Sequence, residues 1–216
     1  MMRLNLEGTD STPPTILCLG AHADDIEIGC GGTILRLAEQ YPDCMFHWVV
    51  FSATGDRKAE AQRGADLFAG SRLKSLSLRN SPDGFLPYVG GELKLVFERE
   101  LKQLSPNLIF THYGDDAHQD HRLISELTWN TFRDHLILEY EIPKYDGDLG
   151  QPSVFIPLEM ELSRKKVRLI MDTFQSQRDK HWFEATTFFS LMRLRGIECR
   201  AAGGHAEAFY CRKLVL

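Results

Sequence analysis

The feature that most restricts the fold of this chain is an alternation of short apolar runs with stretches of helical periodicity. Residues 15–20 (TILCLG) and 45–52 (MFHWVVFS) have the length and composition of buried strands, and residues 58–68 place apolar side chains on one helical face. The same alternation continues up to residue 134. We predict strands at 15–20, 45–52, 76–78 and 107–111, and helices at 31–40, 58–68, 89–104 and from residue 120 onward.

Strands that alternate with helices pair in parallel through right-handed crossovers, and helices cover both faces of the sheet. The pattern therefore predicts an α/β fold with a Rossmann-like, doubly wound and mostly parallel sheet. In the common strand order 3-2-1-4, the first and fourth strands are neighbours where the order reverses. The loops that follow Leu19 and Phe110 should then face one another, and we expect the functional site there.

The pattern is less regular after residue 134. We predict strands at 136–142 and 154–157, helices at 163–174 and 182–191, and a last strand at 208–216. The segment KYDGDLGQP, between the first two of these strands, is expected over the rim of the site. The chain has no internal repeat or interdomain linker. We therefore predict a single domain over residues 1–216, in which residues 136–216 complete a core formed by residues 15–135.

Composition narrows the class of protein. The 216 residues carry a formal net charge of -5, which argues against a nucleic-acid partner, because such proteins present a basic surface to phosphates. No apolar run approaches the roughly 18 to 20 residues of a transmembrane helix, and the first residues lack the apolar core of a signal peptide. The five cysteines form no CxxC pair, which fits a reducing compartment. We predict a cytoplasmic protein and leave its oligomeric state open.

Two groups of histidines and acidic residues follow the first and the fourth predicted strands. One lies in A-H-A-D-D-I-E-I-G-C-G-G-T (21–33), and the other in H-Y-G-D-D-A-H-Q-D-H (112–121). Imidazole nitrogens and carboxylate oxygens at short spacing are ligands for a divalent metal. For either group alone, aspartates that cap a helix explain the pattern equally well. Two such groups at one switch point favour a metal site, whose ligands the pattern alone does not assign.

Both segments resemble the two signature motifs of the PIG-L/LmbE family of zinc-dependent N-deacetylases, which are written AHPDDxExGxGGT and HxxxDxHxDH. The resemblance covers residues 15–135 and, more faintly, residues 206–209 (AEAF). The order of strands and helices is also similar to the family's Rossmann-like fold. One position departs from the motifs, because Ala23 stands where the family usually has proline. This change affects the rigidity of the loop and removes no functional group.

The resemblance implies a metal site with three protein ligands. His22, Asp25 and His121 would bind Zn2+, or alternatively Fe2+, and one coordination position would be left for water.

The resemblance also implies the catalytic groups. Asp24 would be the general base, and His118 would stabilise the oxyanion or protonate the leaving amine. Asp120 would hold the His118 ring in its required tautomer. Asp116 is a further candidate for supporting the ligands.

Outside the two motifs, two residues are candidate substrate contacts. Arg57 begins a predicted helix and has the chemistry to reach hydroxyl or phosphate groups, although an exposed helix face explains it equally well. Asp83 lies in a PDG turn, and turn chemistry alone would also place it there. Cys30 is interpreted as a small buried thiol and not as a ligand. His205 and the segment 144–152 are left without a role.

These features predict a metal-dependent hydrolase. By resemblance, it would remove the N-acetyl group from an N-acetylglucosamine-containing small molecule or glycoconjugate and release acetate and a free amine. One alternative is a Rossmann-type nucleotide-binding protein, but the sequence G-C-G-G is not GxGxxG, and the carboxylates after the first strand would repel a pyrophosphate. A second alternative is a non-catalytic metal or sugar binder on the same fold.

Overall fold

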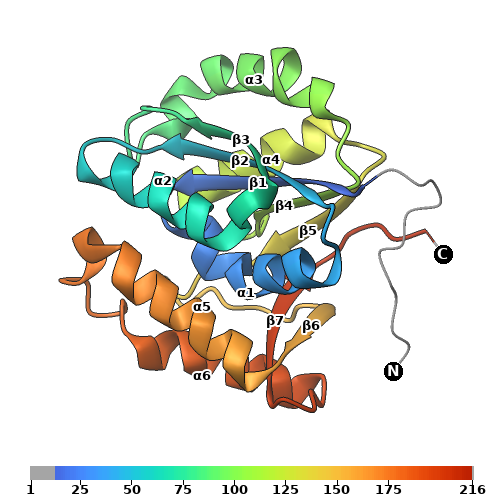
Figure 1. Ribbon diagram of the computed structural model, residues 1–216. Helices are drawn as coiled ribbons and strands as arrows, with labels where there is room; N and C mark the ends of the chain where they lie inside the picture. The colour runs from blue at the N-terminus through green and yellow to red at the C-terminus, as the bar shows by residue number, and fades with distance from the viewer. Residues whose placement is uncertain (1–12, 216) are drawn as a thin grey trace.

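The computed structural model describes residues 13–215, which form a seven-stranded sheet with helices on both faces (Figure 1). The predicted α/β fold is therefore confirmed. The strands are β1 (Thr15–His22), β2 (Met45–Ser52), β3 (Leu73–Leu78), β4 (Leu108–His112), β5 (Leu136–Tyr140), β6 (Val154–Leu158) and β7 (His205–Tyr210). The α-helices are α1 (Asp25–Gln40), α2 (Asp56–Ala69), α3 (Gly90–Arg99), α4 (Gln119–Thr131), α5 (Met160–Thr173) and α6 (Ala185–Glu198). Short 3-10 helices are η1 (Gly70–Arg72), η2 (Leu86–Val89), η3 (Leu101–Leu104) and η4 (Gln175–Gln177).

Five strands form the parallel part of the sheet in the order β3-β2-β1-β4-β5, which confirms the predicted order of the first four. Because side chains of a strand alternate between its two faces, β1 contributes to two cores. Ile16 and Cys18 pack with side chains of α1, α2, α5 and α6, whereas Leu17 and Leu19 pack with those of α3 and α4. In Figure 1, α3 lies above the sheet, and α1, α5 and α6 lie below it.

The sheet continues beyond β5 with an antiparallel edge. β7 pairs with β5 on one side and with β6 on the other, and Leu158 of β6 faces His205. The strands predicted on either side of the KYDGDLGQP segment both form, with β7 between them. Within the described range, no helix is both long enough and apolar enough to cross a membrane. Residues 1–12, for which no signal peptide is predicted, lie outside that range.

Several predicted boundaries are wrong. β3 begins at Leu73, earlier than predicted, because the polar pair Lys74-Ser75 interrupts the apolar run of this edge strand. The helix predicted at 89–104 is divided into α3 and η3, which are separated at Glu100, where φ is -115° and ψ is -57°. α6 spans 185–198 in place of 182–191.

The last strand is also shifted, from the predicted 208–216 to β7 at 205–210. The pairing with β5 ends at Tyr210, and the side chain of Arg212 turns to Glu139 and the ring of Trp129. Residue 216 lies outside the described range.

Helix α1 is kinked at Cys30, where φ is -139° and ψ is 15°. A kink frees main-chain N–H groups that a regular helix would pair internally. Here the N–H groups of Gly32 and Thr33 donate to the carboxylate of Glu207 in β7, at 2.8 and 2.6 Å. A side chain from the opposite end of the sequence therefore caps the second half of α1.

Lys166 of α5 completes this arrangement. Its Nζ donates to the carbonyl oxygen of Ile28 at 2.6 Å and lies 2.5 Å from Oε1 of Glu207. Both charged side chains are only 3% exposed. The lysine thus supplies the positive charge that a buried carboxylate requires and satisfies a carbonyl beside the kink.

Candidate metal centre

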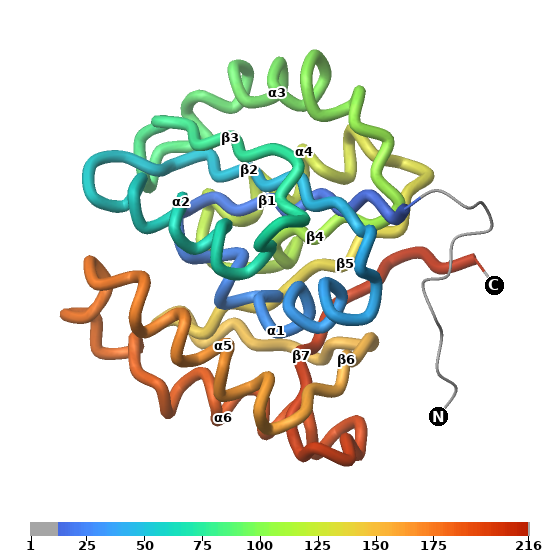
Figure 2. The backbone as a smooth tube through the Cα atoms, in the orientation of Figure 1, coloured from blue at the N-terminus to red at the C-terminus, as the bar shows by residue number. Residues whose placement is uncertain are grey.

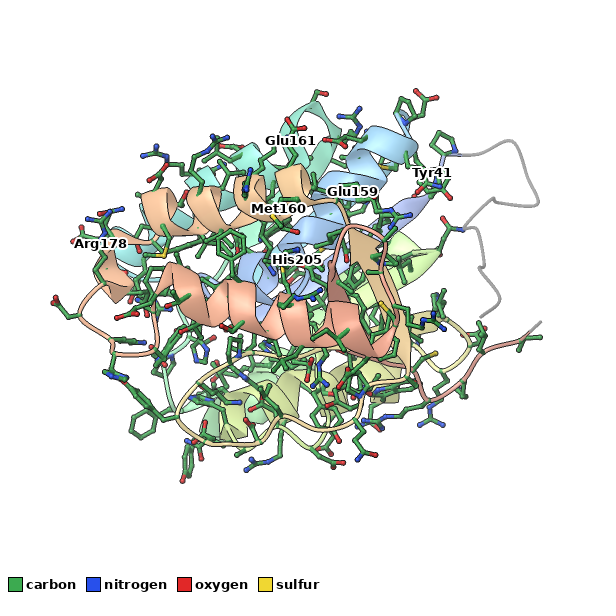
Figure 3. All side chains as sticks on the ribbon, turned by 90° about the horizontal axis from the view of Figure 1, so that it is seen from below. Tyr41, Glu159, Met160, Glu161, Arg178 and His205 are labelled. Carbon is green, nitrogen blue, oxygen red and sulfur yellow. The ribbon has the colours of Figure 1, made fainter. Side chains whose placement is uncertain are left out.

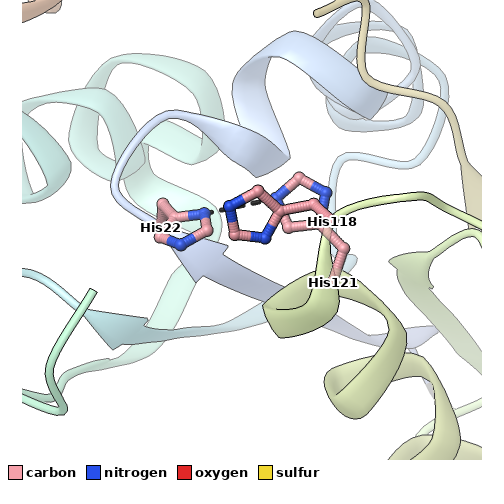
Figure 4. Close-up of side chains that lie close together, drawn as sticks. All are labelled: His22, His118 and His121. Carbon is pink, nitrogen blue, oxygen red and sulfur yellow. Dashed lines mark hydrogen bonds between the residues drawn. The ribbon is translucent and has the colours of Figure 1, made fainter. Parts of the chain in front are cut away.

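The two groups of histidines and acidic residues meet at the carboxyl ends of β1 and β4. His22 is the last residue of β1, and Asp25 is the first residue of α1. His118 directly precedes α4, and His121 lies in its first turn. Figure 4 shows the three imidazole rings of His22, His118 and His121 converging between these elements. The topology therefore brings together the residues that the two motifs predict.

Three of these side chains, His22, Asp25 and His121, approach one another in pairs. Nδ1 of His22 lies 3.2 Å from Nε2 of His121 and 3.3 Å from Oδ2 of Asp25, and Nε2 of His121 lies 3.5 Å from Oδ1 of Asp25. Ligands bound at about 2.1 Å around a tetrahedral zinc ion are about 3.4 Å apart. The separations therefore fit a metal ion among these three residues.

The remaining nitrogen of each ring faces a carboxylate. Nε2 of His22 is 3.2 Å from Oδ2 of Asp120 and 3.1 Å from Oδ1 of Asp83. Nδ1 of His121 is 3.0 Å from Oδ2 of Asp116. A histidine that binds a metal usually donates its other N–H to such an acceptor, which fixes the ring and its tautomer. The pattern of partners thus agrees with the distances.

Other combinations of donors are also close in space. Donor atoms lie within 4.8 Å of one another in each of the sets His22/His118/His121, Asp25/His112/His121 and His22/Asp83/Asp120. His112, to which the sequence analysis gave no role, is fully buried and stacks on the His121 ring with centroids 3.9 Å apart. Its Nε2 accepts the N–H of Ala21 at 2.9 Å, so the lone pair of that nitrogen is already engaged. The sequence did contain a signal for His112, because it is the first residue of the second motif.

The ionisable side chains at the site shift one another's pKa. Burial alone would raise the pKa of Asp25, but the neighbouring His121, His112 and His22 lower it well below its usual value. Burial would likewise lower the pKa of His22, but Asp25 and the other carboxylates around it raise it well above its usual value. The carboxylate is therefore held as an anion, as a metal ligand must be.

Asp24 is buried at the N-terminus of α1, and its side chain pairs with Arg57. Nη2 of Arg57 donates to Oδ1 of Asp24 at 2.9 Å, while Nη1 donates to Oδ2 of Asp83, also at 2.9 Å. Burial raises the pKa of Asp24, and Arg57 opposes that effect. The two candidate substrate contacts, Arg57 and Asp83, are thus joined to each other and to the candidate base.

His118 is placed as a neutral hydrogen-bond donor. Its Nδ1 accepts the main-chain N–H of Asp120 at 3.2 Å, so the proton of the neutral ring is on Nε2. Burial, together with the nearby His22, lowers the pKa of His118. The ring can therefore donate from Nε2 to an oxyanion without first being protonated.

The contact expected between the Asp120 carboxylate and the His118 ring is not formed. That carboxylate instead faces His22 and accepts main-chain N–H groups of Gly84 and Leu86, at 2.8 and 3.1 Å. The reason is the path of the chain before η2, which folds back over the start of α4. Asp120 therefore orients a candidate ligand and fixes the loop that carries Asp83.

The remaining residues that the sequence analysis considered lie in different places. Cys30 is buried in the core at the kink of α1, and its thiol donates to the carbonyl of Ile26. His205 lies at the start of β7, next to Glu159 and Met160 in the view of Figure 3, and belongs to none of the donor sets above. The segment 144–152 packs against the second loop, where Lys144 contacts Asp116. That lysine had no local signal in the sequence.

A protein-family model described as PIG-L, GlcNAc-PI de-N-acetylase, matches residues 17–132, which is more than half of the chain. The matched range contains both loops of the site.

Solved structures with the same fold include deacetylases and one hydratase. The N,N'-diacetylchitobiose deacetylase of Pyrococcus horikoshii is 19% identical, with a TM-score of 0.68, over 91% of this chain and 83% of that chain. The zinc-inhibited form of teicoplanin deacetylase Orf2 is 12% identical, with a TM-score of 0.66, over 91% and 97%. The 4-carboxy-2-hydroxymuconate hydratase GalB of Pseudomonas putida KT2440 is 17% identical, with a TM-score of 0.72, over 94% and 98%. At these identities the likeness concerns the fold.

Proposed function

The chain belongs to the PIG-L family of metal-dependent deacetylases, and from this membership we propose that it hydrolyses the N-acetyl group of an N-acetylglucosamine-containing molecule. The products are acetate and a free amine. The observation that carries the proposal is the approach of one nitrogen each of His22 and His121 to the two carboxylate oxygens of Asp25 and to each other, with separations of 3.2 to 3.5 Å that suit one metal ion. Deacetylases among the structural neighbours support the same reaction class.

The metal is proposed to be Zn2+, with Fe2+ as the alternative. Two imidazoles and one carboxylate suit either ion, and three protein ligands leave room for water and substrate. When bound, the metal supplies a Lewis acid that polarises the acetamide carbonyl and makes water a stronger acid.

The protein residues divide the proton transfers between them. Asp24 takes a proton from the attacking water at a carboxylate oxygen and returns it to the nitrogen of the leaving amine. His118 donates from Nε2 to the developing oxyanion, an interaction that stabilises the transition state more than the substrate. Asp120 keeps Nε2 of His22 occupied, so that Nδ1 stays directed at Asp25 and His121.

Arg57 and Asp83 are proposed to bind hydroxyl groups of the sugar. They are joined at 2.9 Å beside Asp24, and the Asp83 side chain is 55% exposed. A substrate that reaches Asp24 therefore approaches past this pair.

The test measures metal content and acetate release with the same preparations. Wild-type protein purified without chelators is expected to hold about one metal ion per chain and to release acetate from one or more members of a panel of N-acetylglucosamine conjugates. Asp25→Ala is expected to lose tight metal binding and activity. Asp24→Asn is expected to keep the metal, with kcat reduced about 100-fold or more.

Asp115→Asn is the matched control, because Asp115 lies in the second loop but is exposed. It should leave both readouts unchanged. Metal binding without acetate release, or full activity in Asp24→Asn, contradicts the proposed reaction. Water addition to an unsaturated acid, the type of reaction named for the structurally similar hydratase, would redirect the assignment to that class.

A further inference from the structure

Lys144, in the segment that joins β5 to β6, is held almost entirely within the protein. Its side chain is only 9% exposed. Nζ lies 3.1 Å from Oδ2 of Asp116 and 2.5 Å from Oδ2 of Asp148, and 3.9 Å from Oδ2 of the more exposed Asp146. The segment can be followed along the tube in Figure 2, from the end of β5 to the start of β6. A buried lysine with carboxylate partners on two segments fixes both of them.

The Asp116 carboxylate is shared between Lys144 and a candidate metal ligand. Its Oδ2, which Lys144 contacts, also accepts Nδ1–H of His121 at 3.0 Å. Its Oδ1 accepts the main-chain N–H of His118 at 2.7 Å. The orientation of this one carboxylate thus determines where Nε2 of His121 points, and Lys144 is the cation that holds it.

Asp148 holds the neighbouring main chain. Its Oδ2 accepts the N–H of Ala117 at 2.7 Å as well as contacting Lys144. Asp116 and Ala117 are therefore held through both side chain and main chain by the same short segment. Lys144 is common to the two sets of contacts.

We propose that Lys144 is a positioning residue for metal binding: it fixes Asp116 so that His121 directs Nε2 toward His22 and Asp25. This inference rests on the proposed function, because it takes His121 as a ligand. Lys144 touches neither the metal donors nor the candidate base. Its effect on the site passes through Asp116.

A purely electrostatic role predicts the opposite sign. A positive charge near a cation site weakens metal binding, so its removal would tighten binding. A positioning role predicts weaker binding, because partners that orient metal ligands typically change metal affinity by about 10- to 100-fold when they are lost. The direction of the change therefore distinguishes the two roles.

The experiment compares Lys144→Met, Lys144→Arg and Asp146→Asn. Metal dissociation constants for Zn2+ are measured on stripped protein by competition with a chromophoric chelator. Lys144→Met is expected to raise the dissociation constant by about 10- to 100-fold. Lys144→Arg, which keeps the charge and a donor, should restore it to within a few-fold of wild type. Asp146→Asn removes a more exposed carboxylate of the same segment, 3.9 Å from Nζ, but leaves the contacts of Lys144 with Asp116 and Asp148, and it should bind zinc like wild type.

Kinetics at saturating zinc provide a second readout. Lys144→Met should lower kcat and leave KM near the wild-type value, because Lys144 does not touch the substrate. If Lys144→Met does not fold, Lys144→Gln takes its place and is held to the same expected values.

Equal or tighter zinc binding in Lys144→Met overturns the inference, as does an equal loss in Asp146→Asn. Wild-type protein that binds no metal or releases no acetate would instead contradict the proposed function. The two failures are therefore distinguishable.

Discussion

Lys166 contacts Ile28 and Glu207 next to the segment of His22 and Asp25, whereas Lys144 contacts Asp116 in the segment of His118 and His121. Both lysines are nearly excluded from solvent, at 3% and 9% side-chain exposure, and both contact buried carboxylates. They differ in what else those carboxylates hold. Glu207, the partner of Lys166, accepts main-chain N–H groups of α1, and Asp116, the partner of Lys144, accepts the ring of a candidate metal ligand.

The difference separates support of the fold from support of the site. The pair of Lys166 and Glu207 completes a kinked helix inside the core, so its loss should appear as reduced stability. The contacts of Lys144 lie one side chain away from the donor atoms, so its loss should appear first in metal affinity. Two ion pairs of similar burial are therefore expected to have different consequences.

The largest effect on stability is expected for Lys166→Met. The change leaves the Glu207 carboxylate buried without its cation and the Ile28 carbonyl without its donor, which should cost about 3 to 5 kcal/mol. Chemical denaturation measures this loss. A stability equal to that of wild type would remove the distinction between the two lysines, as would a metal dissociation constant raised by Lys166→Met in a protein that stays folded.

A smaller effect separates two glycines near the site, Gly29 in α1 and Gly114 in the loop before α4. A Cβ on Gly29 would lie 2.2 Å from the ring of Tyr140, which is buried and fixed by the hydrogen bond from its hydroxyl to the Leu19 carbonyl. Gly29→Ala should therefore destabilise the protein by about 1 to 3 kcal/mol.

Gly114→Ala is the matched variant in the second loop. Its Cβ would meet Nη2 of Arg212 at 2.2 Å, but that side chain is half exposed and can move away. The expected loss is below about 1 kcal/mol, and thermal unfolding of the two variants in parallel measures both. Equal losses of stability in the two variants would show that the surroundings of Gly29 and Gly114 are equally rigid.

The smallest effect is expected for Arg212→Ala. The guanidinium pairs with the buried Glu139 at 2.7 Å, and Glu139 keeps the N–H donors of Gly114 and Trp129 after the change. Because Arg212 is 50% exposed and screened by solvent, the loss should be at most about 1 kcal/mol, without a change in zinc affinity. A weakened metal site in this variant would extend the support of the second loop beyond Lys144.

Local patterns predicted the strands, their order and the two groups of site residues. Apolar runs and helical spacing are properties of neighbouring residues, and the loops at the switch point follow from the strand order. The sequence did not reveal which carboxylate faces which imidazole. Asp120 faces His22 because residues 84–86 fold back onto it, a contact that spans 36 residues for Gly84.

The sequence also did not reveal which distant segments support the two motifs. Lys144 reaches Asp116 from a segment that looked like an irregular loop, and Glu207 reaches α1 across 175 residues. Lys144 stands in no pattern that distinguishes it from a solvated charge, and the faint resemblance at residues 206–209 does not indicate that Glu207 caps α1. Such partners are set by the three-dimensional packing of the last strands and helices, which no local periodicity encodes.

The cap that Glu207 places on α1 also constrains the order in which the chain acquires its structure. During synthesis, the carboxylate that pairs with Gly32 is added 175 residues after Gly32 itself. Until then, two N–H groups of the kinked helix have no acceptor in Glu207. The long stretch of chain between α1 and Glu207 must also close before the cap can form. The half of the site that carries His22 and Asp25 is thus synthesised before the half that carries His118 and His121, but its helix is capped only after both.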